Sequence, residues 1–578
     1  MKPKHWEIAF AISQEQQDLF AHYHPAILQL LWNRGFYTQE AIDIFLAPDW
    51  KRDAHHPQHF SQMVEAVNLI FEALEHRQVI SIHGDYDADG VCGTAVMIIT
   101  LRDICRQLGY DESRITHYIP HREKEGYGIS KKTVEHLFRD VGTKLIVTVD
   151  CGISNIEAIA HAKTCGINVI VCDHHDVPEA LPNAVLIHPQ VKTESYPYKY
   201  LSGTGVAYKV AHALIEKANE KGAGFHEGYE KWLLDLVAIS TITDIMPLTG
   251  ENRVLEKYGL LVLNKTRRLG LHKLVEVSGG IFGKLDSVSI GYQIGPRLNA
   301  AGRMQHANVA LELLIAEDEQ EAEQLAQELQ ELNAERQKQS EAIFQEAKRQ
   351  VENANEQALI IAVGEGWPAG LVGLVAGKLV AEYGRPVFVV GKENEFYVGS
   401  GRSVGRFHMT EALQKVSEHL DAFGGHPQAC GFSTTGKERL EKVIEGLQQY
   451  SRNIFNNEMP FSIIQIDGVL DLNQINWEFL QKLERFSPHG EKNPRPIFLS
   501  ERVEVKGIDV VGINGKHLRL TIQSSGGALV KMIGFKFGDW IHKLRLGSLI
   551  DVVYEIGVNE WNGTREIQLI LKDLMVSE

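Results

Sequence analysis

VISIHGDYDADGVCGTA, residues 79–95, places a short buried strand directly before a loop crowded with polar side chains. The apolar run 79–82 has the length and β-branched content of a buried strand, and an apolar helix is predicted over residues 95–101. Carboxylates just past a strand end point into one crevice of an open α/β sheet, where ligands usually bind. The loop carries four candidate ligands: His83, Asp85, Asp87 and Asp89.

Carboxylates packed this closely repel one another, so the loop needs a cation. Hard oxygen ligands with one imidazole suit Mn²⁺ or Mg²⁺ better than a metal that prefers thiolates. Two plainer interpretations compete, a solvated polar turn and a calcium loop of the EF-hand type. An EF-hand loop requires Glu at its twelfth position, and the residue twelve along from Asp85 is Val96.

Length and composition predict a soluble protein of several domains. With 578 residues the chain has room for about four domains of ~150 residues each. Residues 1–10 are polar and lack the pattern of a signal peptide, and no apolar run approaches the length of a membrane span. We therefore expect a cytoplasmic protein without a membrane partner.

The cysteines predict neither zinc sites nor disulfides, and the negative net charge does not by itself exclude binding to nucleic acid. The six cysteines form no Cys-x-x-Cys pair, which predicts reduced core residues rather than zinc ligands or disulfides. The net charge of −16 speaks against nucleic acid only if it is evenly spread. Residues 317–356 hold twelve acids and four bases, which give −8, half of the total. Local basic patches could still bind phosphate.

Further candidate ligands follow later strands. Strands are predicted over residues 144–149, 168–172 and 185–188, with helices at 154–164 and 203–217 between or after them, which indicates a parallel sheet with helices on both faces. Asp150 follows the first of these strands, Asp173-His174-His175 follows the second, and Asp244 ends an apolar helical stretch. Taken singly, the aspartates could be helix N-caps and the histidines core residues. Their recurrence at the carboxyl ends of successive elements favours a shared metal site.

The rest of the chain divides by pattern. Residues 1–50 look like a small helical cap. Residues 303–363 contain neither Gly nor Pro and carry apolar residues at helical spacing, which predicts a long charged connector helix. A dimeric coiled coil is the alternative, but Arg336 and Gln339 interrupt its stripe. A second, smaller α/β domain follows.

The C-terminal region changes to short alternating strands separated by Gly or Asn turns, with one helix at 475–483. This pattern predicts a small barrel of the OB type. Its basic and aromatic residues either contact phosphates and stack on bases or simply pack. These residues are Lys506, Lys516, Arg519, Lys531, Lys536, Arg565, Phe535, Trp540 and Trp561.

Seven motifs in order along the chain resemble those of the RecJ family of single-strand-specific DNA exonucleases, within the DHH phosphoesterase superfamily. A lone Asp-His-His would be a weak match, whereas seven motifs in family order are specific. The motifs are His83-x-x-x-Asp87-x-Asp89, Asp150, Asp173-His174-His175, Asp244 in TITDIMPLTGENR, RLNAAGR at 297–303, GSGR at 399–402 and GGH at 424–426.

The resemblance implies an α/β multidomain fold that covers the chain from about residue 25 to the end. The implied parts are a helical cap (1–50), a parallel-sheet DHH domain (51–300), a connector helix (301–355), a smaller α/β DHHA1 domain (356–455) and an OB-fold barrel (456–578). No further domain is expected after the barrel, which puts partners that use such an extension in doubt.

The resemblance also implies a two-metal site with Mn²⁺ or Mg²⁺. Asp150 would bridge the two ions and counts, with His175 and Arg303, among the catalytic residues. His175 would orient a neighbour or assist proton transfer, while Asp85 and Asp173 would support the ligands. Two ions roughly 4 Å apart would activate a water and neutralise phosphodiester charge. The implied ligands are His83, Asp87, Asp89, Asp150, His174 and Asp244.

Substrate contacts follow from the same motifs. Arg122, Ser400 and Arg402 are similar to the family's pocket for a 5′-phosphate, and Arg303 with Asn299 would contact the scissile phosphate. A guanidinium suits this role because its fork can bind two phosphate oxygens. The competing structural interpretation is that such arginines pair with surface acids.

In the second domain, His426 would face the metals. Cys430 stands where alanine is commoner in the family, a near-isosteric change that should not matter. Arg297, like Arg402, is open to the interpretation of a surface ion pair.

Together these features predict a 5′-to-3′ exonuclease that releases mononucleotides from single-stranded DNA, in repair and recombination. The alternatives are a hydrolase of small phosphoesters (nanoRNA, cyclic dinucleotides or pyrophosphate) and an inactive scaffold that only binds single strands. The expected partners are single-stranded DNA, a single-strand binding protein and a repair helicase, and the expected state is a monomer.

Overall fold

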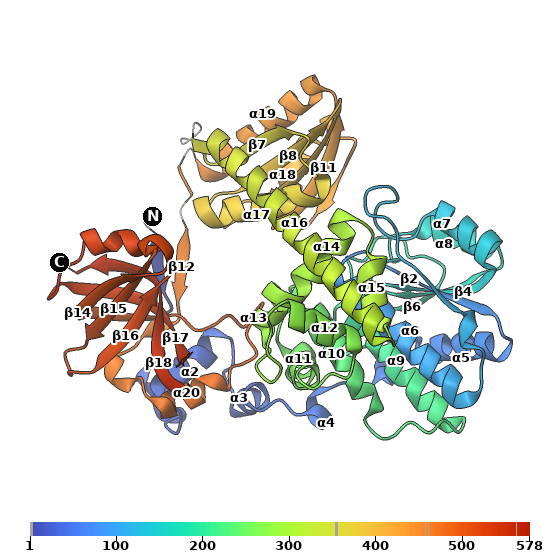
Figure 1. Cartoon of the computed structure of the whole chain (residues 1–578), viewed down its shortest axis with the longest axis horizontal. Coiled ribbons are helices and arrows are strands. Elements are labelled where there is room, and N and C mark those ends of the chain that lie inside the picture. Colours follow the sequence, from blue (N-terminus) through green and yellow to red (C-terminus); the bar gives the residue numbers. More distant parts are fainter. Residues whose placement is uncertain (1–3, 353–356, 457, 461, 562, 578) are drawn as a thin grey trace. The chain divides into compact units, whose positions relative to one another are not determined.

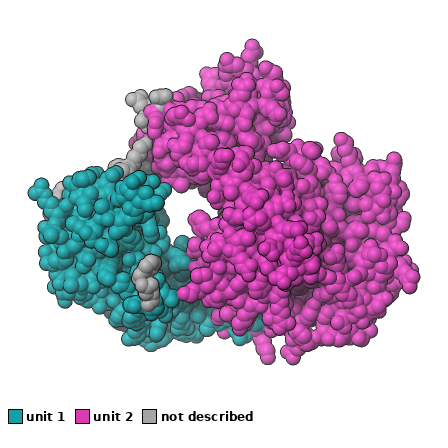
Figure 2. Space-filling model, in the orientation of Figure 1, with its two compact units in different colours: residues 1–50, 461–578 teal, residues 51–460 magenta. Residues whose placement is uncertain are grey.

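The computed structural model describes residues 4–352, 357–456, 458–460, 462–561 and 563–577. They form two compact units, one of residues 51–460 and one of residues 1–50 with 461–578 (Figure 2). Residues 353–355, at the end of the predicted connector, and residue 461 lie outside the described part of the chain, as does the Trp561 side chain. None of the helices described could cross a lipid bilayer.

A five-stranded sheet, of which Figure 1 labels β2, β4 and β6, forms the centre of the first domain of residues 51–460. Its strand order is β3-β2-β4-β5-β6. Every neighbouring pair is parallel, which confirms the parallel sheet. Strand β3 is not predicted from the sequence because its four residues, ITHY, are half polar and lie at the sheet edge. The strands are β2 (Val79–Gly84), β3 (Ile115–Tyr118), β4 (Thr143–Val149), β5 (Asn168–Cys172) and β6 (Val185–Ile187).

Helices cover both faces of this sheet. On β4, Ile146 packs in one core cluster with residues of α7 and α8. Val149 points to the opposite face, where a Cβ on Gly93 of α6 would lie 2.5 Å from its side chain. The helices are α5 (Met63–Glu75), α6 (Ala88–Leu108), α7 (Lys131–His136), α8 (Ile156–Thr164), α9 (Gly203–Glu220) and α10 (Leu234–Thr243).

The predicted connector helix is shorter than expected. The chain turns extended at Ala316, and the Asp318 carboxylate accepts a hydrogen bond from the amide of Glu321, which starts a new helix. Along its described length this helix, α16, packs against α12, α14 and α17 of the same chain, which favours a connector over a dimeric coiled coil. The helices are α11 (Gly250–Leu263), α12 (Leu269–Val277), α13 (Ser287–Ser289), α14 (Gly295–Met304), α15 (Asn308–Ile315) and α16 (Glu319–Glu352).

The second, smaller domain has a mixed sheet in the order β10-β11-β9-β8-β7, in which only β7 and β8 are parallel. Separate apolar clusters cover its two faces. Its elements are β7 (Ile360–Glu365), α17 (Ala369–Tyr383), β8 (Val387–Glu393), β9 (Phe396–Arg402), α18 (Met409–Gln414), β10 (Ala422–Gly425), β11 (Ala429–Thr435) and α19 (Lys437–Phe455).

The other unit contains the predicted barrel. Strand β14 pairs with both β15 and β17, which closes five strands into a ring, β14-β15-β16-β18-β17. The elements are β12 (Ile463–Ile466), β13 (Gly468–Val469), α20 (Trp477–Glu484), β14 (Phe498–Val511), β15 (His517–Gln523), β16 (Leu529–Gly534), β17 (Leu549–Trp561) and β18 (Thr564–Val576).

Residues 1–50 lie in the same unit as the barrel. They contain a strand as well as the expected helices, because β1 pairs in parallel with β12. Leu28 and Leu31 of α2 belong to the apolar cluster that fills the barrel. The elements are β1 (His5–Ile8), α1 (Gln14–Leu19), α2 (Pro25–Asn33), α3 (Gln39–Leu46) and α4 (Trp50–Asp53).

Candidate active site

The register of the parallel sheet brings the predicted acids together. Gly84 of β2 lies opposite Val149 of β4, which in turn lies opposite Cys172 of β5. The residue that follows each of them is an aspartate at the same sheet edge: Asp85, Asp150 and Asp173.

The acidic loop after β2 is shorter than the sequence suggests. The Asp87 carboxylate accepts hydrogen bonds from the amides of Asp89 and Gly90, which caps α6 and starts the helix at Ala88. Asp89 therefore lies in the first turn of a helix. Both carboxylates are nevertheless held at the carboxyl edge of the sheet, as predicted.

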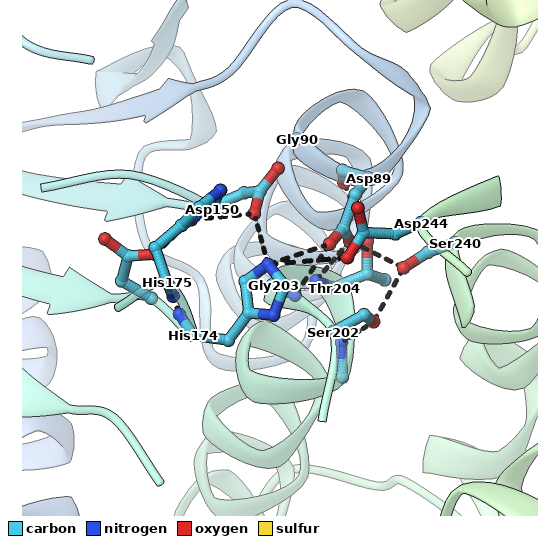
Figure 3. A network of polar contacts seen from close by, with 12 residues as sticks. Asp89, Gly90, Asp150, His174, His175, Ser202, Gly203, Thr204, Ser240 and Asp244 are labelled. Atoms are coloured by element: carbon cyan, nitrogen blue, oxygen red, sulfur yellow. Dashed lines mark hydrogen bonds and ion pairs between the residues drawn. The ribbon is translucent and has the colours of Figure 1, made fainter. Parts of the chain in front are cut away.

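Asp89 is fixed from its other side by the start of α9. Its two oxygens accept hydrogen bonds of 2.7 Å from the amides of Gly203 and Thr204, and a third from the Ser240 hydroxyl (Figure 3). Ser240 also contacts the Ser202 hydroxyl, the N-cap of α9. This network leaves the Asp89 carboxylate a single orientation.

Asp150 has a left-handed backbone, with φ of 62°. The Gly203 Cα lies so close that a Cβ there would stand 2.5 Å from the Asp150 Cβ. The interpretation of Asp150 and Asp244 as N-caps is wrong: α8 begins after Asn155, and Asp244 is the C-cap of α10. Neither carboxylate therefore caps the N-terminus of a helix.

His174 is the point at which three of the acids meet. Its Nε2 lies 3.1 Å from Asp150 Oδ1, 3.5 Å from Asp244 Oδ2 and 3.7 Å from Asp89 Oδ2 (Figure 3). The His174 side chain is only 8% exposed. Residues from four separated segments of the sequence therefore share one buried centre.

His175 turns the other way, toward Asp173. Its Nδ1 lies 2.9 Å from Asp173 Oδ1 and 2.9 Å from the hydroxyl of Tyr127, which donates to the backbone oxygen of Asp150. Burial lowers the pKa of His175, but the hydrogen bond and charge of Asp173 outweigh it and raise the pKa to about 9. Asp173 also accepts three backbone N–H bonds, so it braces the whole histidine loop.

The donor set fits divalent cations. Burial and the charges of neighbouring aspartates raise the pKa values of Asp85, Asp87, Asp150 and Asp244. The buried side-chain atoms that lack a hydrogen-bond partner among the described residues include four at this site: His83 Nε2, Asp85 Oδ1, Asp150 Oδ1 and His174 Nε2. Buried polar atoms without partners are costly, and a bound cation would satisfy them.

The donors form three overlapping groups, in each of which the ligand atoms lie within 4.8 Å of one another. Asp150 belongs to two groups and His174 to two, which is the arrangement that a pair of ions requires. Asp85, predicted to be a supporting residue, lies among the donors, whereas His83 lies outside all three groups. The groups are Asp150-His174-His175, Asp89-His174-Asp244 and Asp85-Asp87-Asp150.

Four arginines without an acidic partner lie near the metal donors. After burial, the charges of Arg122, Arg336 and Arg402 lower the pKa of Arg303, to about 10. In the described part of the chain none of the four forms an ion pair with a carboxylate. Unpaired guanidinium groups held together in this way call for an anion with several oxygens, such as phosphate.

The second domain contributes to this arginine cluster. Arg402 donates to the Ser400 hydroxyl, and Arg303 donates to the backbone oxygen of Gly370 in the first turn of α17. A Cβ on Gly373 would lie within 3.1 Å of both Ser400 Oγ and Arg402. The N-terminus of α17 therefore faces the cluster, and a helix N-terminus itself attracts anions.

Three other residues that the sequence analysis singles out are Asn299, His426 and Arg297. Asn299 accepts a hydrogen bond from the amide of Ala88 at the start of α6. His426 is 61% exposed, with Nδ1 3.5 Å from the Asp176 carboxylate just after the histidine loop. Arg297 binds Gln330 and a backbone oxygen, so the interpretation of a surface ion pair is wrong for it.

The barrel offers fewer free bases than expected. Lys506, Arg519 and Lys531 pair with glutamate or aspartate side chains. Arg565 lies over the ring of Trp477, at 5.6 Å, and Phe535 is 56% exposed. Exposed aromatic rings of this kind can stack on bases.

Two site residues are not predicted from the sequence. Ser240 fixes Asp89 but sits in an apolar helix without a motif of its own. Arg336 joins the arginine cluster from α16, and its only signal is that it breaks the apolar stripe of that helix.

Family models match three parts of the chain: the DHH family N-terminal domain at residues 79–241, the DHHA1 domain at 355–453 and the RecJ OB domain at 466–573. The single-stranded-DNA-specific exonuclease RecJ of Bacillus subtilis is 37% identical over 99% of this chain and 71% of its own length. RecJ of Haemophilus influenzae is 31% identical over 95% of this chain and 96% of its own length.

Solved structures agree with these matches. The crystal structure of Thermus thermophilus RecJ with Mn²⁺ superposes with a TM-score of 0.83 at 28% identity, covering 99% of this chain and 80% of that one. The same protein with Mg²⁺ gives a TM-score of 0.77 at 27% identity, over 99% and 79%.

Proposed function

Since this chain belongs to the RecJ family of single-stranded-DNA-specific exonucleases, we propose that it removes mononucleotides from the 5′ end of single-stranded DNA. It is a metal-dependent hydrolase with a DHH, a DHHA1 and an OB domain. The observation that carries the proposed polarity is the unpaired arginine cluster beside the overlapping Asp and His donors. Repair and recombination of DNA are the setting typical of this family.

The proposed metal ligands are Asp87, Asp89, Asp150, His174 and Asp244, with His83 as a further imidazole. Two Mn²⁺ or Mg²⁺ ions held there supply Lewis acidity, which activates a water and neutralises charge on the phosphodiester. Asp89 and Asp150 are preoriented for this by the start of α9. Asp85 would share in the ligation or support it.

The substrate's first phosphate would occupy the pocket of Arg122, Ser400 and Arg402. Arg303 and the side-chain amide nitrogen of Asn299 would bind the scissile phosphate one nucleotide further on. Water adds to that phosphorus and the bond to O3′ breaks, so a 5′-mononucleotide leaves and the shortened strand keeps a new 5′-phosphate. His175, oriented by Asp173, would assist proton transfer at the reacting phosphate through its Nε2 atom. His426 would lie near this phosphate.

The test is digestion of matched single strands labelled at the 5′ or the 3′ end, with Mn²⁺ or Mg²⁺. A 5′ label should appear at once as a mononucleotide, while a 3′ label stays on long products. Asp150→Asn should abolish cleavage and keep strand binding. Early release of the 3′ label, or full activity of Asp150→Asn, would overturn the proposal.

The two alternative functions predict other outcomes. A hydrolase of small phosphoesters would cleave dinucleotides or pyrophosphate faster than long strands. An inactive scaffold would bind strands without cleaving them under either metal.

The proposal extends to partners and setting. The chain acts on single-stranded DNA, and we propose that a single-strand binding protein presents that DNA and that a repair helicase generates it. It would act as a monomer in the cytoplasm, because all proposed ligands come from one chain and its bacterial relatives have their DNA in that compartment.

A further inference from the structure

A second set of metal-type donors lies between helices α7 and α8, separate from the active site. Glu135 offers a carboxylate oxygen, His161 an imidazole nitrogen and Cys165 a sulfur, and the three atoms lie within 4.8 Å of one another. Nothing in the proposed exonuclease reaction uses these residues.

Helical geometry brings the three donors together. His161 lies in the last turn of α8 and Cys165 is the C-cap of that helix, four residues further on, so their side chains lie on the same face. Glu135 reaches them from α7. His161 Nε2 lies 2.6 Å from Glu135 Oε1 and 3.9 Å from Cys165 Sγ, so all three donors converge on the same point.

The three side chains are partly exposed, so an ion can reach them from solvent. The side chains of His161 and Glu135 are 28% and 35% exposed, which leaves a path for an ion. Cys165 is the only one of the six cysteines, all of them in the described part of the chain, that is not buried. Arg139 holds the second oxygen of Glu135 at 2.8 Å, so the first oxygen stays directed at His161.

We propose that Glu135, His161 and Cys165 bind one Zn²⁺ ion, with water as the fourth ligand. A thiolate with an imidazole selects zinc over Mn²⁺ or Mg²⁺, and three protein ligands with one open position form a common tetrahedral set. On binding, the Cys165 thiol loses its proton to solvent, and a neutral His161 binds through Nε2 with its proton on Nδ1. The thiolate and the Glu135 carboxylate then balance the charge of the ion.

Such an ion would join α7 to α8. Both helices pack in one apolar cluster with β4 and β5, the strands whose ends carry Asp150 and Asp173. The site would therefore stabilise the layer of helices that supports one side of the active-site edge. From the sequence alone only the His161 and Cys165 pair can be recognised, because Glu135 lies 26 residues before His161.

The test uses the full chain and Co²⁺ as a spectroscopic substitute for Zn²⁺. Co²⁺ should give a sulfur-to-cobalt charge-transfer band, which the Asp and His ligands of the active site cannot produce, and one equivalent of Zn²⁺ should bleach it. Cys165→Ser should lack the band, while Cys151→Ser, which removes the thiol 3.6 Å from His83, should keep it.

His161→Ala provides a second measurement. Loss of an outer partner costs about 10- to 100-fold in metal affinity, so loss of a ligand should weaken Zn²⁺ binding at least about 100-fold. His136→Ala is the matched control, because His136 lies on α7 and pairs with Asp140 instead. Zn²⁺ should raise the melting temperature of the wild type and of His136→Ala but not that of His161→Ala.

The proposal is overturned if the wild type shows no charge-transfer band, or if Cys165→Ser retains it. Equal Zn²⁺ affinity in His161→Ala and His136→Ala would overturn it as well. Exonuclease activity should persist in Cys165→Ser, so failure of this site and failure of the exonuclease proposal are separable.

Discussion

Gly203 lies so close to Asp150 that a side chain on the glycine and the aspartate Cβ could not occupy their present positions together. The first turn of α9 is thus fitted against the residue shared between two donor groups, and its amides hold Asp89 at the same time. The start of one helix positions two acids, Asp150 after a strand and Asp89 in the first turn of another helix.

Gly203→Ala should therefore displace Asp150 and lower the exonuclease rate by roughly 100-fold, the usual cost of a shift of about 1 Å in a catalytic group. Gly205→Ala is the matched control, because a Cβ there would lie 3.4 Å from its neighbours, an ordinary contact. Steady-state rates and circular dichroism measure the effect. A Gly203→Ala protein as fast as Gly205→Ala would contradict the predicted displacement.

Ser240→Ala should weaken metal binding by about 10- to 100-fold, because it removes a hydrogen bond that orients the Asp89 carboxylate. Mn²⁺ titration by calorimetry gives the affinity. Thr241→Ala removes a buried hydroxyl that donates to the Val237 backbone oxygen of its own helix, so it should change stability and leave Mn²⁺ affinity intact. Similar affinities in the two variants would show that Asp89 is oriented without the serine.

Arg336→Gln should weaken binding of a 5′-phosphorylated single strand by about 10-fold and reduce the salt dependence of binding by about one phosphate contact. The reason is that Arg336 adds positive charge to the cluster around Arg303, and no carboxylate among the described residues forms an ion pair with Arg336. Fluorescence anisotropy at several salt concentrations measures both quantities. Lys338→Ala, an exposed base on the same helix paired with Glu335, should leave the slope unchanged.

Glu256→Gln should stabilise the protein at neutral pH. Glu256 is fully buried, neither oxygen has a hydrogen-bond partner among the described residues, and burial raises its pKa well above the ordinary 4.5. The folded state thus binds the proton more tightly than the unfolded state. Stability is lost as pH rises above about 4.5, by up to about 1.4 kcal/mol per pH unit.

Urea unfolding between pH 4 and pH 8 should show the stability difference between Glu256→Gln and the wild type growing with pH. Glu251→Gln gives the contrast: Glu251 is paired with the buried Lys209, so this substitution should destabilise by about 3 kcal/mol. A Glu256→Gln protein with the same pH profile as the wild type would contradict the prediction.

Much of the fold could be predicted because local patterns carry it. Buried parallel strands are short apolar runs, and the proposed ligands Asp150 and His174 lie within two residues of the ends of such runs. Strand β3 escapes prediction because an edge strand need not be apolar, and the break at Ala316 escapes because a single Asp cap outweighs strong helical periodicity.

The site could be predicted only in part, since no local pattern encodes convergence. Ser240 and Arg336 act on residues far away in the sequence, and only the folded chain brings them there. Asp244 follows a helix rather than a strand, and the sequence indicates it both by the apolar helical stretch that it ends and by its motif.

The pairing of β1 with β12 joins residues 5–8 to residues 463–466. On a ribosome that adds 5–20 residues per second, the first strand waits roughly 20 to 90 seconds for its partner. The amino-terminal segment must stay unpaired while the nuclease domains complete their own folding, so a chain stalled before residue 463 would leave the apolar residues of α2 uncovered and open to chaperones or proteases.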